Sequence, residues 1–308
     1  MTSAGLTPAA QSTGHARTLA PKGSAGRALL VYLREQLQVL HEQDPRVRDN
    51  APDAVHKMRT ATRRLRSALA SYRALLDRET ADRLRGELRW LAGVLGIARD
   101  AEVLHERLRD EVTDRLVGVA GVTTDAIDEL LGSNVQTTQL TVLDVLQSER
   151  YFQLLAALAA LLANPPLTSE ARLPARRVAQ NEIDSDGKRL RRAVRSARAL
   201  PEGVERDRAL HEVRKRAKRL RYAAEAAVPV APKQAGRMVD LAQSLQEALG
   251  EHQDSVVARD VLLRLGAEAH ARGEDAFGFG RLHALEEVRA SAAEARFRRD
   301  WRALLRAL

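Results

Sequence analysis

Two stretches of this chain carry basic residues at the same spacing. Residues 55–69 read VHKMRTATRRLRSAL, and residues 210–224 read LHEVRKRAKRLRYAA. The matched positions are His56 with His211, Arg59 with Arg214, Arg63 with Lys218, Arg64 with Arg219, Leu65 with Leu220, and Arg66 with Arg221. Arginine can hold two oxygens of a phosphate at once, and lysine acts as a mobile point charge, so the repeated pattern points to the binding of anions.

The spacing predicts that both stretches are amphipathic helices. At about 100° per residue, offsets of 0, 3, 7 and 10 from each histidine fall within a sector of roughly 80°. These offsets hold His56, Arg59, Arg63 and Arg66 in one copy and His211, Arg214, Lys218 and Arg221 in the other. A second, apolar stripe at offsets of −1, 2, 9 and 13 is typical of a buried face. Like charges one turn apart repel, so we expect a counter-charge.

The composition favours a helical protein with a large core. The chain has 308 residues, of which 44% are hydrophobic and only 3% aromatic. It carries 50 basic against 41 acidic side chains, a net charge of +9. It has no cysteine, which excludes disulfides and thiolate metal sites. The apolar run at 154–163 is too short for a membrane span, and the N-terminal residues lack the apolar core of a signal peptide, so we expect a cytoplasmic protein.

The pattern along the chain predicts an all-α fold. Residues 1–25 are rich in small and polar residues and are expected to form a disordered tail. Asp53 and Asp207 are expected to cap the two basic helices, and Leu-Gly pairs at 95–96 and 249–250 are expected to end the helices that follow. The expected helices are 27–43, 53–77, 80–96, 99–117, 124–146, 150–163, 174–200, 207–227, 234–250, 253–272 and 281–308.

The repeat extends beyond the basic helices. Residues 91–103, LAGVLGIARDAEV, align with residues 245–257, LQEALGEHQDSVV, at nearly the same offset. Two matched segments at nearly the same offset predict two homologous four-helix bundles, 26–165 and 170–308, related by a pseudo-two-fold axis. We expect the two basic helices to face a shared basic central cavity.

These residues resemble the CHAD domain family, the conserved histidine α-helical domains. The resemblance covers roughly residues 26–308 and rests on H-x-x-R-x-x-x-[RK]-R-L-R, present twice, and on the L-G-x-x-x-D element after each copy. It implies two four-helix bundles with a basic groove that binds inorganic polyphosphate; some members associate with polyphosphate or polyester granules. The residues that it assigns to the anion site are His56, Lys57, Arg59, Arg63, Arg64, Arg66, His211, Arg214, Lys215, Lys218, Arg219 and Arg221. One departure is Arg99, which is Gln253 in the second half.

Metal-dependent phosphate hydrolysis is the enzymatic alternative. His211-Glu212 begins an H-E-x-x-H pattern, but Lys215 stands where the second histidine is needed. The H-x-D pattern of His252 and Asp254 is absent from the first half. Because nothing forms a four-ligand set and no phosphate-binding glycine loop is present, we expect no catalysis, metal or cofactor.

Nucleic-acid binding is the alternative among binding proteins, and the net positive charge favours it. However, Tyr222 is the only aromatic residue within the two motif copies, which also contain no Asn or Gln to read bases. A plain solvated helix face is the simplest interpretation of one basic run, but repetition in register argues against it. The sequence therefore predicts a non-enzymatic polyphosphate-binding protein, for which coating of a granule is a compatible role.

Overall fold

The computed structural model describes residues 20–115 and 124–308, and within these ranges the chain is almost entirely helical. The first half contains α1 (Ala25–Arg48), α2 (Ala54–Ser71), α3 (Arg78–Arg115), α4 (Thr124–Leu146) and α5 (Glu149–Ala163). The second half contains α6 (Ala175–Arg198), α7 (Val204–Ala227), α8 (Pro232–Ala271) and α9 (Phe277–Ala307). Short 3-10 turns lie at Arg73–Leu75 and Ser169–Arg172. The described residues form no strand, which confirms the predicted all-α class.

The two longest helices correct the prediction that Leu-Gly pairs end a helix. The expected helices 80–96 and 99–117 are one helix, α3, and the expected helices 234–250 and 253–272 are one helix, α8. Gly96 and Gly250 lie inside these helices, and an arginine of the neighbouring helix lies over each of them. The glycines serve a close approach between helices and do not terminate them.

Several helix ends also differ from expectation. The α1 helix extends past its expected end at residue 43 and contains Pro45. Asp53 does precede α2, but its backbone is left-handed (φ 59°) and its side chain makes no capping hydrogen bond. The α7 helix begins at Val204, after Gly203, so Asp207 lies in its first turn. Asp207 is instead within 3.4 Å of His252 Nε2, a tertiary contact that outweighs the local capping preference.

The expected tail at 1–25 falls mainly outside the described residues, but residues 20–25 are packed against the rest of the chain. The Ala25 amide donates to the Leu173 carbonyl at 2.8 Å, and the Ala175 amide donates to the Gly23 carbonyl at 2.9 Å. Ser24 accepts a hydrogen bond from the Arg27 amide and caps α1. The start of the first half is therefore fastened to the start of the second.

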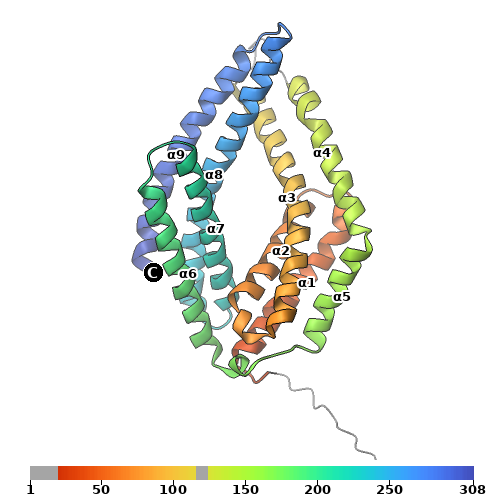
Figure 1. The fold of residues 1–308 in the computed structure, drawn as a ribbon, viewed down its shortest axis with the longest axis vertical. Helices are drawn as coiled ribbons and strands as arrows, with labels where there is room; N and C mark the ends of the chain where they lie inside the picture. The colour runs from red at the N-terminus through yellow and green to blue at the C-terminus, as the bar shows by residue number, and fades with distance from the viewer. Residues whose placement is uncertain (1–19, 116–123) are drawn as a thin grey trace, which may run out of the picture.

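The two halves have separate cores and meet at two places. One is where Ala226 of α7 packs against the first core, and the other is at the opposite end of the molecule. One core is built from α1–α5, with Ala226 of α7 at its edge, and another from α6–α9. A third cluster, formed by α3, α4, α8 and α9, joins the halves at the far end, where Arg107 of α3 pairs with Glu286 of α9 at 2.6 Å. In Figure 1, α2 and α3 face α7 and α8 across the middle of the molecule, between these two contacts.

Candidate anion-binding site

The structure brings the two basic helices together. The Tyr72 hydroxyl, which follows α2, donates to the Ala223 carbonyl of α7 at 3.2 Å. Arg64 of α2 makes a two-pronged ion pair with Glu225 of α7, with hydrogen bonds of 2.7 and 3.0 Å. These contacts hold α2 beside α7, so the flanks of the two helices share one region, as the repeated pattern predicted.

A matched arginine on each helix lies over a glycine. A Cβ atom placed on Gly96 would lie 3.7 Å from the Arg59 guanidinium, and one on Gly250 would lie 3.3 Å from Arg214 Nη2. Arg59 Nη2 reaches Asp100, one turn beyond Gly96, at 3.2 Å. The Nε groups of both arginines are buried and have no acceptor among the described residues. The glycine of each L-G-x-x-x-D element thus leaves room for the arginine of the basic helix, and the aspartate supplies a carboxylate near it. The Nε donor of each arginine remains unused within the described ranges.

Replacement of these glycines by alanine tests the close approach of the two arginines. Alanine in a helix interior is favoured over glycine by about 0.5–1 kcal/mol. Gly96→Ala should raise the free energy of unfolding by about this amount, because its methyl group would make an ordinary contact with Arg59. Gly250→Ala should gain less, because Arg214 must move aside. Urea denaturation measures both, and a larger gain for Gly250→Ala would contradict the observed packing.

Lys218 lies at the centre of the shared region. Its side chain is only 8% exposed, and no described residue forms a hydrogen bond or ion pair with it. Burial, followed by the charges of Arg63, Arg214 and Arg59, lowers the pKa of Lys218 to about 6, against a smaller opposing effect of Asp254. Three arginines from two helices and this lysine thus form a group that we call the central cluster; its members are Arg59, Arg63, Arg214 and Lys218.

The repeated histidines lie one turn from the central cluster. Partial burial and the charge of Arg99 lower the pKa of His56. His211 Nδ1 lies 2.8 Å from Gln253 Oε1, and burial together with Lys215 lowers the pKa of His211. Arg99 therefore takes in the first half the place that Gln253 has in the second. Its direct effect on His56 was not foreseen, although the aligned difference signalled it.

The remaining predicted residues divide according to their partners. Arg219 pairs with the buried Asp186 of α6 at 2.9 Å, and Arg64 with Glu225. Both arginines join helices through largely buried carboxylates, whereas Arg59 of the central cluster pairs with Asp100, whose side chain is 73% exposed. Lys215 pairs with the exposed Glu212 at 2.6 Å, and Lys57 is an exposed residue of α2. Their assignment to the anion site remains a prediction.

Arg66 and Arg221 are the last members of the two rows of basic residues that run along α2 and α7. Arg221 reaches Glu225 at 3.3 Å and lies over the Tyr222 ring, whereas Arg66 makes no ion pair with a described residue. Asp254 is the acidic residue of the second L-G-x-x-x-D element. It acts on Arg214 electrostatically, and its own pKa is raised by burial. The acids near the cluster are thus too few to neutralise its charge.

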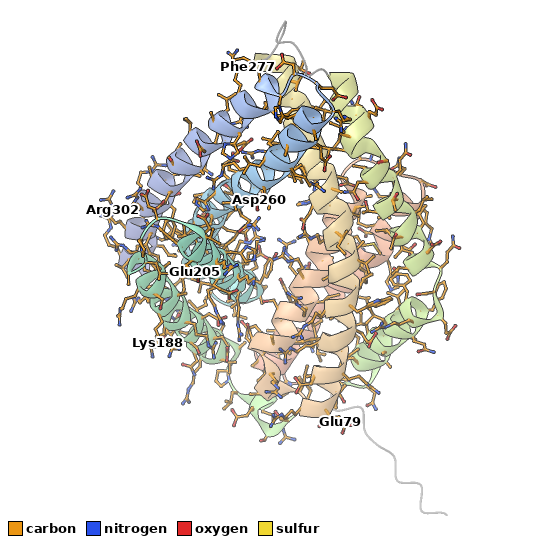
Figure 2. All side chains as sticks on the ribbon, turned by 45° about the horizontal axis from the view of Figure 1, so that its top comes forward. Glu79, Lys188, Glu205, Asp260, Phe277 and Arg302 are labelled. Atoms are coloured by element: carbon orange, nitrogen blue, oxygen red, sulfur yellow. The ribbon has the colours of Figure 1, made fainter. Side chains whose placement is uncertain are left out.

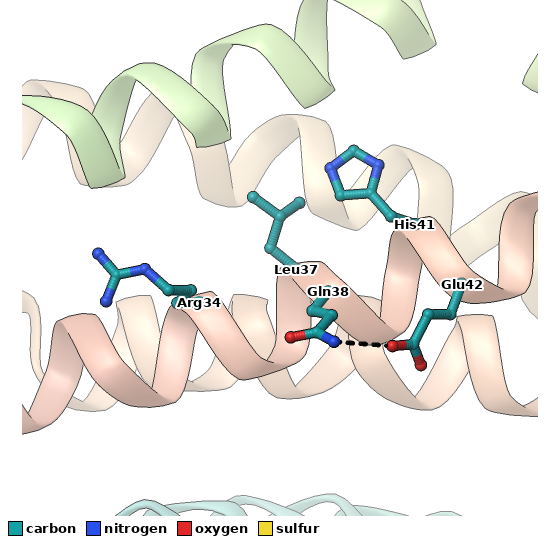
Figure 3. A pocket seen from close by; sticks show the side chains of 5 residues that line it. All are labelled: Arg34, Leu37, Gln38, His41 and Glu42. Carbon is teal, nitrogen blue, oxygen red and sulfur yellow. Dashed lines mark hydrogen bonds between the residues drawn. The ribbon is translucent and has the colours of Figure 1, made fainter.

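One surface depression lies elsewhere, on α1. It has a volume of about 420 Å³ and is lined by Arg34, Leu37, Gln38, His41 and Glu42. Figure 3 shows that these side chains come from successive turns of one helix. Gln38 Nε2 donates a hydrogen bond to Glu42 Oε1 at 2.9 Å. Because Glu42 offsets the one arginine, this depression does not suit a polyanion.

The fold and the site define a two-part helical protein with a cluster of cations between its parts. The CHAD domain model matches residues 31–263, and the chain belongs to that family. It is 37% identical to two proteins of Mycobacterium tuberculosis, the uncharacterized proteins MT2285 and Rv2226, over 99% of this chain. The match covers 59% of each relative, so the chain spans about three fifths of their length.

Solved structures show the same fold. PptA from Streptomyces chartreusis has a TM-score of 0.75 and 25% identity, covering 91% of this chain and 99% of that one. The CHAD domain from the plant Ricinus communis has a TM-score of 0.69 and 23% identity, covering 94% of this chain and 98% of that one. No helix within the described ranges is long and apolar enough to cross a membrane.

Proposed function

We propose that this chain binds inorganic polyphosphate without catalysing its turnover, and that the central cluster is the principal contact. The observation that supports this most directly is the convergence of Arg59, Arg63, Arg214 and Lys218 from two helices without enough carboxylates to neutralise them. Like charges held together in a partly buried region destabilise the free protein, and a bound polyanion would relieve that cost. Membership of the CHAD family agrees with this ligand.

The length of the basic rows favours a chain of phosphates over a single phosphate. From His56 to Arg66 the row extends along ten residues of α2, or about 15 Å at 1.5 Å per residue. A row of donors of that length matches a flexible polymer that carries negative charge on every unit. Association with polyphosphate granules would follow from the same contacts and is part of the proposal.

Nucleic acid is a weaker candidate for these contacts. Single-strand binders stack bases on exposed aromatic rings. Tyr222, the one aromatic residue of the two motifs, is only 6% exposed, and the Arg221 guanidinium lies 4.9 Å from the centre of its ring. The site therefore presents charge without a platform for bases.

The direct test is calorimetric titration with long-chain polyphosphate and with single-stranded DNA of equal total charge. We expect much tighter binding of polyphosphate and a steep loss of affinity with salt, because bound counterions are released. Equal affinity for the two ligands would favour a general polyanion binder. Phosphate release should be measured on the same sample with and without Mg²⁺ or Mn²⁺, and turnover would favour the metal-dependent hydrolase.

A further inference from the structure

The helices α2 and α3 run antiparallel in a register that two contacts define. Arg59 lies over Gly96, and Arg73, in the 3-10 turn that follows α2, pairs with Asp82 near the start of α3. Every step forward along α2 is therefore matched by an equal step backward along α3. Two turns beyond Arg59 this register places Arg66 opposite Arg89.

The facing side of α3 carries further cations. Gly96, Ala92, Arg89, Arg85 and Asp82 follow one another at intervals of three or four residues, so they lie along one face of the helix. The charges of Arg89 and Arg85 are among the causes that lower the pKa of Arg66, after burial and Arg63, which agrees with this placement.

These two arginines differ in how firmly they are held. Arg89 is exposed and has no hydrogen bond or ion pair with a described residue. Arg85 donates to Asp82 at 2.6 Å, and its Nε is buried without an acceptor. Asp82 also pairs with Arg73 and, at 3.9 Å, with Arg78, so its charge is already balanced by the three arginines that contact it. The row of positive charge therefore continues from Arg66 onto α3.

The second half has no such continuation. There Arg214 lies over Gly250, and the same register places Arg221 opposite Gln243, with Val239 one turn further. His211 beside Gln253, at 2.8 Å, agrees with this register. The row on α7 then reaches Glu225, which pairs with Arg221 and with Arg64. Gln243 and Val239 of α8 thus stand where α3 has Arg89 and Arg85, and the row on α7 ends at a carboxylate.

We propose that a bound polyphosphate chain leaves the central cluster on one side only, along α3 over Arg66, Arg89 and Arg85. Arg89 then contacts only chains long enough to extend past the cluster and serves as a chain-length specificity residue. This inference rests on the proposed function. It assigns a role to a residue outside both motifs and predicts unequal contributions from two halves of similar sequence.

The test compares Arg89→Ala with Gln243→Ala, its counterpart by register on α8. Both side chains are exposed and alanine suits a helix interior, so both variants should fold. Arg89→Ala should weaken binding of long-chain polyphosphate about 10-fold, the loss of one charge-assisted contact, and lower the salt slope by about one. Its affinity for tripolyphosphate should not change, and Gln243→Ala should match the wild type for both ligands.

A gain-of-contact variant gives a second readout. Gln243→Arg adds to the second half the charge that Arg89 supplies in the first, and we expect tighter binding of long chains with unchanged binding of tripolyphosphate. If Arg89→Ala leaves long-chain affinity unchanged, or weakens both ligands equally, the one-sided path is wrong. If the wild-type protein binds neither ligand, the proposed function itself fails, which is a separate result.

Discussion

Arg63→Ala combined with Lys218→Met should weaken polyphosphate binding by roughly 100- to 10,000-fold. The range corresponds to two charge-assisted hydrogen bonds of about 1.5–3 kcal/mol each. Lys218 is buried among Arg59, Arg63 and Arg214, so the double variant removes two of the four cations of the central cluster. Calorimetric titration with long-chain polyphosphate measures the loss.

The same double variant should be at least as stable as the wild type. Removing a buried like-charge contact relieves repulsion, and methionine fills nearly the volume of lysine. Far-ultraviolet circular dichroism and thermal unfolding check this. If the variant unfolds, these residues serve packing, and the central cluster is not a ligand site.

The matched control is Arg219→Ala, which should lower stability while leaving polyphosphate affinity nearly unchanged. Arg219 pairs with Asp186, whose side chain is 1% exposed. Loss of the arginine leaves that buried carboxylate with one arginine fewer, which should cost about 1–3 kcal/mol of stability. We expect polyphosphate affinity to stay within a few-fold of the wild type. Equal losses of affinity in both variants would contradict the division between cluster and connecting arginines.

Polyphosphate binding should take up a proton near neutral pH. With a pKa of about 6 in the free protein, Lys218 is mostly neutral at pH 7.5, whereas a bound polyanion favours its charged form. Affinity should therefore rise as the pH falls from about 8 towards about 6, by at most about tenfold per pH unit for one proton. Below pH 6 the free protein already holds this proton, and the contribution of Lys218 levels off.

Calorimetry in buffers of different ionisation enthalpy measures this proton directly. Lys218→Arg is the control, because arginine stays charged; it should bind polyphosphate and take up less than the wild type. His56 and His211 are present in both proteins, so the difference in proton uptake between them isolates the contribution of Lys218. Equal proton uptake by wild type and Lys218→Arg at pH 7.5 would remove Lys218 as the source.

The unfolding of the free protein should follow the same linkage. In the unfolded chain Lys218 has its ordinary pKa of 10.5 and holds a proton at neutral pH, whereas the folded protein does not. The unfolded state therefore binds more protons between about pH 6 and 10.5, so this group makes the protein more stable as the pH rises through that window.

Periodicity in the sequence was enough to predict the helices and the residues that share a helix face. The apolar stripe of α2 and α7 is buried as expected, with Met58, Leu65 and Leu220 almost fully enclosed. The repeat also predicted that the two basic helices meet. Such inferences succeed because the helix repeat is a local property, and because a duplicated segment repeats its packing.

The errors came from residues whose role depends on a distant neighbour. Gly96 and Gly250 looked like helix ends because glycine commonly ends helices, yet both lie inside a helix, each under an arginine of the neighbouring helix. Asp207 looked like a cap, yet it lies close to His252. Local preferences of about 1 kcal/mol are readily outweighed by tertiary contacts.

The amino-acid sequence alone thus determines the helical class, the duplication and the identity of the cations on each helix flank. The division of labour among those cations depends on the crossing of α2 and α7. Arg64 and Arg63 are neighbours in the chain. Arg64 pairs with Glu225, 161 residues away, whereas Arg63 belongs to the central cluster. A difference of about 100° around one helix separates these two environments, and only the packed structure shows which direction holds the carboxylate.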